Sequence, residues 1–254
     1  MSSNKGKHIW VIGASSGIGE ALAQELASQG ATLALSARRK DALQNIVKNL
    51  SGTGHISCPV DVSDINALQT TASDIKKKFE RIDSVIFLAA IYSAHDKKKK
   101  DIGFMHKMLN VNVGGAFNVV ETIAPIFETQ GSGQIVLCGS VAGYRGLPYG
   151  QPYCATKAAI INYAESLKIE LEPENIDVKL ISPGFVRTPL TDKNDFPMPM
   201  MIEANDAAKA IARGITSGAF EIHFPKKFTF IMKTLRLLPT WLYFKISRQM
   251  KKKQ

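Results

Sequence analysis

The chain has 254 residues, 45% of them hydrophobic and 21% charged, which is the composition of an ordinary globular protein long enough for one large α/β domain. The net charge is +10, and the segment after His223 contains nine basic residues and no Asp or Glu, so residues 1–222 carry a net charge of only +1. Because the excess charge is confined to this segment, it argues against nucleic-acid binding. The sequence contains no run of about 18 apolar residues, so we predict no ordinary membrane-spanning helix. Cys58, Cys138 and Cys154 lack disulfide or metal-ligand spacing, so we expect a reducing, cytoplasmic setting.

Apolar runs that suit strands alternate with helical patterns, which is typical of parallel βαβ units. The predicted strands are 8–12, 32–36, 55–59, 84–89, 134–138, 177–181 and 220–224. The predicted helices are 17–29, 40–50, 64–80, one long helix within 102–129, 152–171 and 205–216. Because the strands are continuous apolar runs, helices should cover both faces of the sheet. The sequence therefore predicts an α/β fold with a single doubly wound parallel sheet.

Three glycines separate the first predicted strand from the first helix. Gly13 permits a tight turn, Gly17 lets the backbone approach a phosphate, and Gly19 lets the helix pack closely on the strand. The helix start would present free N–H groups and a positive dipole end to a pyrophosphate. Glycine-rich turns also serve chain reversal alone. The position of this turn inside a βαβ unit favours dinucleotide binding and a Rossmann-like sheet.

The residues after the second strand bear on the choice of cofactor. NAD-specific sites place an acidic residue there for the ribose 2′-hydroxyl, whereas this chain has Arg38 and Arg39. Arginine suits a 2′-phosphate, so we predict that NADP(H) is preferred over NAD(H); the alternative is that both arginines are solvated charges. Asp61 and Val62 follow the third strand and could meet the adenine.

Tyr153 and Lys157 are four residues apart, so they share one face of a predicted helix. A free tyrosine has a pKa of about 10 and is a poor base at neutral pH, but a neighbouring lysine cation favours the phenolate and lowers that pKa. Ser140, at the end of the fifth strand, could bind a substrate carbonyl or hydroxyl group. The Tyr-x-x-x-Lys pattern alone also fits an ordinary amphipathic helix.

Four features follow one another along the chain: the glycine turn, Ser140 thirteen residues before Tyr153, the Tyr-x-x-x-Lys pattern and Pro183-Gly184. Together they resemble the classical short-chain dehydrogenase/reductase family over about residues 8–222. The resemblance implies seven parallel strands and a hydride passed directly between nicotinamide and the alcohol or carbonyl carbon of a small molecule, so that no metal is needed. It also implies a homo-dimer or homo-tetramer assembled through two long helices.

The resemblance assigns roles to residues as well. Tyr153 would donate or accept the substrate proton, Lys157 would bind the nicotinamide ribose and lower the tyrosine pKa, Ser140 would orient the substrate, and Asn112 would hold a relay water. The expected cofactor contacts are Gly13, Ser15, Ser16, Gly17, Ile18, Gly19, Arg38, Arg39, Asp61, Val62, Ala89, Tyr153, Lys157, Pro183, Gly184, Val186 and Thr188.

Two segments depart from the family pattern. Ile12-Gly13 stands where the family has Thr-Gly, and 87–90 reads Phe-Leu-Ala-Ala where the family has Asn-Asn-Ala-Gly. In the family these two segments lie side by side and exchange polar contacts, so their joint loss of polarity indicates that apolar packing replaces a hydrogen bond between them, while Ala90 would add a methyl group near the cofactor. These departures support an alternative function, a non-catalytic NADP(H)-binding module whose tail recruits a membrane or a partner. A binding module would not require Asn112, Ser140, Tyr153 and Lys157.

We divide the chain into a dinucleotide-binding and catalytic domain, 1–224, and a basic, apolar extension, 225–254. In a helical projection one sector of the extension is free of charge: Phe228, Met232, Leu235, Leu242, Tyr243, Ile246 and Met250. Pro239 should kink or split the helix. The extension either lies in a membrane interface, at the inner face of a membrane, or packs over the pocket or a neighbouring subunit.

The segment after Pro183-Gly184 bears on the substrate, because the family carries a substrate lid there. Its apolar residues are Phe196, Met198, Met200 and Met201. Methionine adapts to irregular apolar ligands, although these side chains could simply be core. With the apolar extension, they favour a lipophilic alcohol or carbonyl substrate.

Overall fold

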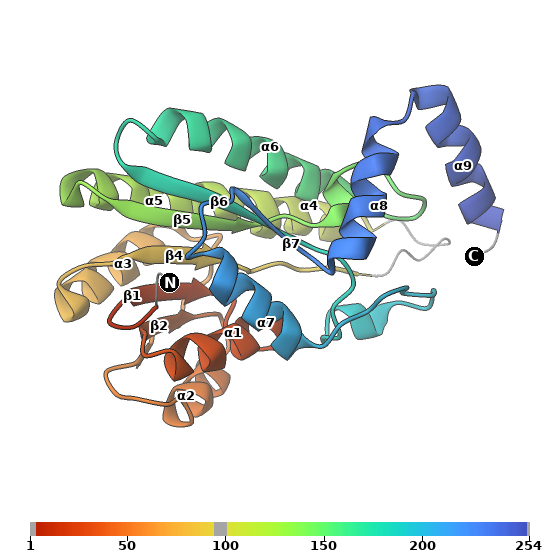
Figure 1. Ribbon diagram of the computed structural model, residues 1–254. Coiled ribbons are helices and arrows are strands. Elements are labelled where there is room, and N and C mark those ends of the chain that lie inside the picture. The colour runs from red at the N-terminus through yellow and green to blue at the C-terminus, as the bar shows by residue number, and fades with distance from the viewer. Residues whose placement is uncertain (1–3, 94–100, 253–254) are drawn as a thin grey trace.

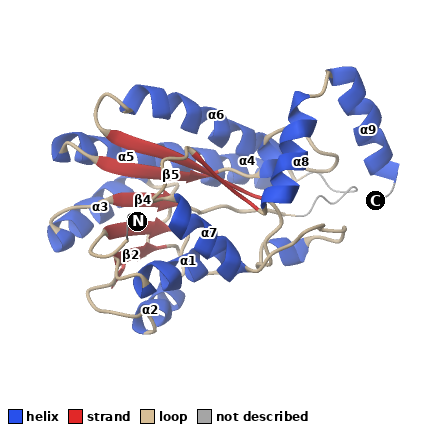
Figure 2. Ribbon diagram, in the orientation of Figure 1, coloured by secondary structure: helices blue, strands red, loops and turns tan. Residues whose placement is uncertain are grey.

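Seven strands form one parallel sheet in the computed structural model, which describes residues 4–93 and 101–252. The strand order is β3-β2-β1-β4-β5-β6-β7, so the direction of winding reverses between β1 and β4 (Figures 1 and 2). Helices cover both faces of the sheet. The predicted doubly wound α/β fold with seven strands is confirmed.

Every predicted strand is present, some with shifted ends. The bounds are β1 His8–Ile12, β2 Thr32–Ser36, β3 Ile56–Ser57, β4 Ser84–Phe87, β5 Gly133–Cys138, β6 Ile176–Pro183 and β7 Glu221–Phe224. The edge strand β3 keeps only two residues because it pairs with β2 alone. The central strands are buried on both sides, which explains why they read as continuous apolar runs.

The helices have the bounds α1 Gly17–Ser28, α2 Lys40–Lys48, α3 Ile65–Phe79, α4 Ile102–Leu109, α5 Gly115–Gln130, α6 Tyr153–Leu171, α7 Ala204–Gly214, α8 Lys226–Leu237 and α9 Thr240–Lys252. The apolar faces of α1, α2 and α7 form one core with their side of the sheet. Those of α3, α5 and α6 form a larger core on the other side. Both cores are held by burial of apolar surface, worth about 25 cal/mol per Å².

The prediction of one long helix within 102–129 is wrong in one respect. A π-helical turn, Asn110–Gly114, separates α4 from α5. The wider turn accommodates one extra residue and leaves the Asn112 side chain buried, with its amide bonded to the backbone of Ile91. These hydrogen bonds offset the loss of regular helix geometry.

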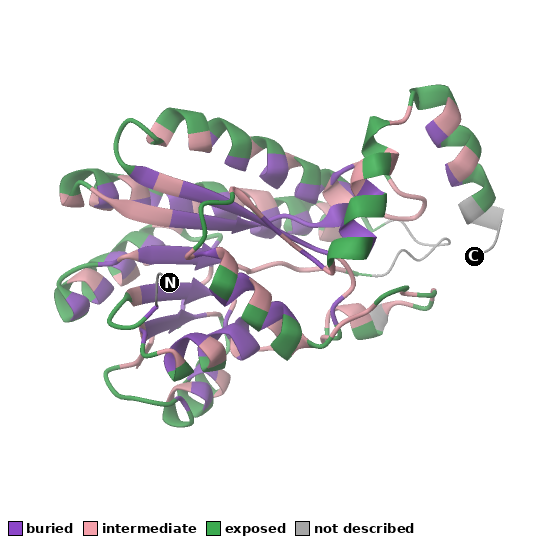
Figure 3. Ribbon diagram, in the orientation of Figure 1, coloured by how far each residue is buried: buried purple, intermediate pink, exposed green. Residues whose placement is uncertain are grey.

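The extension packs against the domain with its predicted charge-free sector (Figure 3). Phe228, Met232 and Tyr243 are buried, and Leu235 packs against the larger core. Leu242 and Ile246 are half-buried, whereas the Met250 side chain lies outside the described structure. As predicted, the chain divides at Pro239 into α8 and α9. No described helix is both long and apolar enough to cross a membrane.

Substitutions on α8 test whether the extension unfolds together with the domain. Met232 is 6% exposed and Phe230 is 70% exposed. We expect Met232→Ala to lower the free energy of unfolding by about 2–5 kcal/mol because it opens a cavity, and the control Phe230→Ala to change it by less than about 0.5 kcal/mol. Urea denaturation followed by circular dichroism measures both. Equal, small effects would show that α8 does not belong to the cooperative core.

Candidate active site

A cavity of about 340 Å³ opens at the carboxyl ends of the strands, beside the point where the winding reverses. Open α/β sheets bind ligands at this position. Every predicted site residue except Asn112 lines the cavity: Gly13, Ser15, Ser16, Gly17, Ile18, Gly19, Arg38, Arg39, Asp61, Val62, Ala89, Ser140, Tyr153, Lys157, Pro183, Gly184, Val186 and Thr188. Seven separate segments of the chain therefore converge on one space.

The glycine turn after β1 depends on two close backbone approaches. Gly13 has a φ of +93°, and a Cβ there would lie 2.6 Å from the backbone nitrogen of Ala89. A Cβ on Gly19 would collide with the carbonyl oxygen of Gly13. At each of these two positions glycine is the only residue that fits, as the sequence predicts. The turn thus lies directly against the end of β4.

The first turn of α1 faces the cavity. Its N-cap residue, Ser16, makes no side-chain capping bond, so the first N–H groups of the helix are available to an anion, aided by the helix dipole. Thr188 covers this turn from the segment after β6: a Cβ on Gly17 would lie 3.1 Å from its Cγ2. The donors and the space fit a phosphate group.

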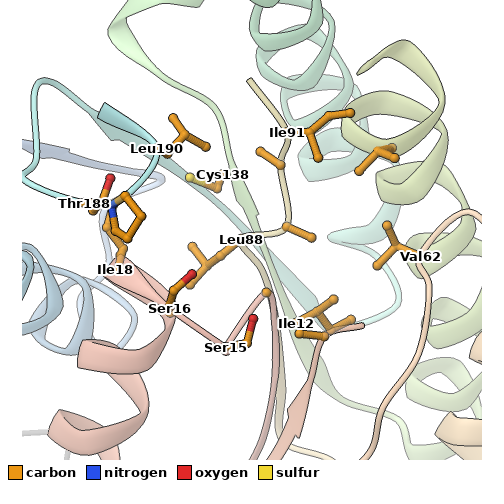
Figure 4. A pocket seen from close by; sticks show the side chains of 18 of the residues that line it. Ile12, Ser15, Ser16, Ile18, Val62, Leu88, Ile91, Cys138, Thr188 and Leu190 are labelled. Carbon is orange, nitrogen blue, oxygen red and sulfur yellow. The ribbon is translucent and has the colours of Figure 1, made fainter. Parts of the chain in front are cut away.

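Apolar side chains replace the family's polar contact between the ends of β1 and β4. Ile12 pairs with Phe87, and the Leu88 N–H donates to the Ile12 carbonyl oxygen at 2.8 Å. The two segments therefore lie side by side, as expected. In Figure 4, Ile12, Leu88, Ile91 and Val62 are set around the cavity, with the Ser15 and Ser16 side chains near the glycine turn. Ala90 also lines the cavity.

Both predicted arginines lie at the end of the cavity beyond β2. The Arg39 guanidinium donates to the Ser15 carbonyl oxygen at 2.8 Å and to its hydroxyl. Hydrogen bonds from Ser63 hold the pKa of Asp61 below its ordinary value, and the charge of Arg38 lowers it further. No acidic residue lies at the end of β2 itself. This end of the cavity is thus rich in cationic donors.

Tyr153, Lys157 and Ser140 meet where β5 and β6 end. Tyr153 opens α6, and Lys157 donates from Nζ to the Cys138 carbonyl oxygen at 2.8 Å. The Ser140 hydroxyl accepts from the Ala142 N–H at 3.1 Å. All three side chains therefore have fixed positions at the cavity wall.

The pKa of Tyr153 differs from the sequence-based expectation. Burial raises it above its ordinary value, and the hydrogen bond with Ser140 opposes this only in part. Burial also lowers the pKa of Lys157. The Lys157 ammonium group donates to the Cys138 carbonyl oxygen and lies 5.6 Å from the centroid of the Tyr153 ring, and the expected lowering of the tyrosine pKa by this cation stays a prediction. In this state Tyr153 is a protonated phenol at neutral pH.

Asn112 lies behind the cavity wall. Its Oδ1 accepts from the Ile91 N–H at 2.8 Å, and its Nδ2 donates to the Ile91 carbonyl oxygen at 3.1 Å and to the Thr156 hydroxyl at 3.3 Å. It therefore joins the segment after β4 to the helix that carries Tyr153.

Sequence reasoning missed several residues at the site. Ile91, Cys138, Leu190 and Thr191 line the cavity, and the Tyr92 ring packs edge-on against Tyr153 with centroids 5.1 Å apart. Ile91 and Tyr92 directly follow a strand next to the glycine turn, which was the available signal, because the carboxyl ends of parallel strands meet at one edge. Leu190 and Thr191 continue the Thr188 segment.

The apolar segment after β6 lies between the cavity and α8. The Phe185 ring packs against Phe196 at 6.1 Å and against Phe228 at 5.4 Å between centroids. Met198 and Met201 are half-buried and Met200 is exposed. The described lining of the cavity ends at Thr191, so a lid function of residues 196–201 stays a prediction.

Solved structures share this fold. A short-chain dehydrogenase from Burkholderia cenocepacia in complex with NADP matches with a TM-score of 0.83 and 22% identity, over 96% of this chain and 98% of that one. A short-chain dehydrogenase/reductase from Burkholderia phymatum in complex with NAD matches with a TM-score of 0.84 and 24% identity, over 92% and 94%.

The sequence also matches known proteins directly. It is 34% identical over 224 residues to 11-beta-hydroxysteroid dehydrogenase-like 4A of Arabidopsis thaliana, covering 84% of this chain and 74% of the relative. The family model of short chain dehydrogenases matches residues 7–197. With the glycine turn, Ser140, Tyr153 and Lys157 gathered around one cavity, the chain belongs to the short-chain dehydrogenase/reductase family of oxidoreductases.

Proposed function

We propose that this protein is an NADP(H)-dependent oxidoreductase that interconverts an alcohol and a carbonyl group of a lipophilic small molecule. One observation carries the proposal: the Tyr153, Lys157 and Ser140 side chains face the same cavity as the glycine turn and the two arginines. A nucleotide bound along the cavity would join these two ends.

The residues present fit a nicotinamide dinucleotide. The uncapped N-terminus of α1 suits the pyrophosphate, and Arg38 and Arg39 suit a 2′-phosphate. The two Burkholderia structures hold NADP and NAD respectively, so the preference for NADP(H) rests on these arginines and on the absence of an acidic residue at the end of β2. When bound, the nicotinamide supplies or accepts the hydride.

The protein's own residues handle the proton. The Tyr153 hydroxyl, whose pKa burial raises, is protonated at neutral pH and is the group that would donate a proton to a carbonyl oxygen. Ser140 would orient that oxygen. Lys157 would bind the nicotinamide ribose and, once it approaches the phenol, lower the pKa of Tyr153 for return of the proton.

An apolar cavity wall supports a lipophilic substrate. Leu88, Ile91 and Leu190 supply much of it, and the Arabidopsis relative carries a hydroxysteroid dehydrogenase-like name. Among the described residues, no group of three or more His, Cys, Asp or Glu is placed to hold a metal ion, and metal-free chemistry stays a prediction.

We further propose a homo-dimer or homo-tetramer assembled through α5 and α6. Phe117 on α5 is 43% exposed and packs edge-on against Tyr163 of α6, with Ile169 exposed farther along α6. The three cysteines are unpaired, which suits the cytoplasmic setting expected from the sequence.

A non-catalytic NADP(H)-binding module is the competing function, favoured by the apolar Leu88 and Ala90 at the cavity.

Cofactor preference can be measured by titration with NADPH and NADH, followed by nicotinamide fluorescence. We expect Arg38→Ala to raise the Kd for NADPH roughly 10- to 100-fold, because a charge-assisted bond to the 2′-phosphate contributes roughly 1.5–3 kcal/mol. The Kd for NADH should stay nearly constant. Lys40→Ala, an exposed cation at the start of α2, is the control. Wild-type protein that binds both coenzymes equally, with no effect of Arg38→Ala, would contradict the assignment.

Catalysis can be separated from binding with Tyr153→Phe. In a screen of lipophilic aldehydes and ketones with NADPH, this variant should lose roughly 10²- to 10⁴-fold in rate, since it lacks the proton donor, while its affinity for NADPH persists. Tyr163→Phe, on the same helix but not among the residues that line the cavity, should keep the wild-type rate. Identical background rates in wild type and Tyr153→Phe would leave only the binding-module function.

The role of Asn112 in joining two segments of the site predicts a loss of stability. Asn112→Ala leaves the Ile91 backbone groups without their partner, so the free energy of unfolding should fall by about 1–3 kcal/mol. Asn110→Ala removes an exposed amide from the same π-helical turn and should change it little. Urea denaturation compares the two, and equal stability would refute this role.

A further inference from the structure

The extension has a second apolar face, which the helical projection of the sequence did not separate. We define the outer face as five large side chains with exposed fractions of 48–83%: Phe230, Ile231, Leu237, Trp241 and Phe244. They are five of the ten exposed large hydrophobic residues of the described structure, within fifteen positions of the chain. Exposed apolar residues gathered in this way mark an interaction surface.

The outer face of α8 is opposite its packed side. Phe230 and Leu237 are seven residues apart and lie on one side of the helix, whereas Phe228 and Met232 on the other side are buried in the core. Packing against this chain's own domain therefore accounts for one face of α8 and leaves the other without a partner among the described residues.

On α9 two exposed aromatic residues are followed by two basic residues on the same side of the helix. Trp241, Phe244, Lys245 and Arg248 are spaced as i, i+3, i+4 and i+7 and are all exposed, so they share one side of the helix. Lys245 and Arg248 form no ion pair with any described residue. No Asp or Glu follows residue 222. Aromatic rings set among cations are typical of helices that lie in the interface of an anionic bilayer.

Charge also argues against a second copy of this chain as the occupant. A symmetric dimer through the outer face would bring the same basic residues of both copies together, and like charges in an interface are costly. A surface of anionic lipid headgroups pairs with these cations and offers acyl chains to the apolar residues.

The two helices are attached to the framework of the active site. The Arg145 guanidinium donates to the carbonyl oxygens of Arg236 at 3.0 Å and Leu238 at 2.7 Å, at the end of α8. It also lies over the Tyr243 ring, 4.3 Å from the centroid, and the Tyr243 hydroxyl bonds the Gly146 carbonyl oxygen. The loop that holds α9 thus leads directly into Tyr153.

The other end of α8 packs on the cavity wall. A Cβ on Gly184, which lines the cavity, would lie 2.7 Å from the Phe228 ring. Figure 1 shows α8 and α9 beyond the carboxyl ends of the strands, which is the edge of the sheet where the residues that line the cavity lie. A surface that docks through the outer face would therefore lie on the same side of the sheet as the cavity.

We propose that the outer face of α8 and α9 docks on an anionic lipid bilayer, with α9 lying in the interface and the active-site cavity held close to the membrane. Docking does not require catalysis; its use, the supply of a lipophilic substrate from the bilayer, rests on the proposed function.

Trp241 gives a direct readout in the full-length protein. The only other tryptophan, Trp10, is fully buried in β1, so a change of emission on adding vesicles reports on Trp241. With vesicles of phosphatidylcholine and phosphatidylglycerol we expect a blue shift and co-sedimentation of the protein. Phosphatidylcholine alone should give little of either, and added salt should reverse the binding because it screens the cations.

Two pairs of substitutions separate the apolar and electrostatic contributions. Phe230→Ser with Leu237→Ser, and Lys245→Glu with Arg248→Glu, should each lower the partition coefficient by roughly tenfold or more. The matched controls are Ile102→Ser on α4 and Lys209→Glu on α7, both exposed and outside the extension; they should bind as wild type. Thermal unfolding by circular dichroism confirms that each variant is folded.

Absence of binding to anionic vesicles, or equal binding by wild type and both outer-face variants, would overturn the proposal. A molar mass that falls in the outer-face variants, without vesicle binding by wild type, would also overturn it and identify a second copy as the occupant. NADPH titration of the same preparations separates the docking proposal from the proposed function. Wild-type protein that does not bind vesicles but binds NADPH with normal affinity contradicts the docking proposal alone.

Discussion

The close contact between the glycine turn and the end of β4 determines the position of the whole site. Gly13 and Gly19 allow the backbone of the turn to lie against Ala89 and against itself, which brings the N-terminus of α1 to the carboxyl edge of the sheet. Because the strands are parallel and in register, the ends of β5 and β6 meet at the same edge. The N-terminus of α1 and the Tyr153 side chain then face one cavity, although about 140 residues separate them in the sequence.

The two ends of the cavity differ in chemistry. Beyond β2 it presents arginines and free N–H groups, which suit phosphates, whereas toward Tyr153 it is walled by Leu88, Ile91 and Leu190. Burial raises the pKa of Tyr153 and lowers that of Lys157, so it favours the uncharged form of both groups. Phe228 of α8 packs next to Gly184 of the cavity lining, and the exposed aromatic residues of α9 lie farther along the extension. The extension is thus joined to the cavity wall at one end and exposes apolar residues toward the other.

Periodicity and local motifs predict the features that depend on neighbouring residues. All seven strands, the glycine turn and the split at Pro239 follow from such patterns. Sequence patterns did not predict the π-helical turn, because it is tied to the hydrogen bond between Asn112 and Ile91, which joins two separate segments of the chain. The raised pKa of Tyr153 depends on burial that only the tertiary structure creates. In the extension, a helical projection found the packed sector but could not tell which apolar residues the domain leaves exposed.

The central claim is that the Tyr153 site catalyses hydride transfer and does not merely bind a nucleotide. The most direct test is to supply NADPH deuterated at C4 of the nicotinamide, with a panel of lipophilic ketones and aldehydes, and to analyse the products by mass spectrometry. We predict one deuterium on the new carbinol carbon per cofactor oxidised in wild type, and none above background in Tyr153→Phe. Tight NADPH binding without deuterium transfer to any member of the panel would contradict the claim.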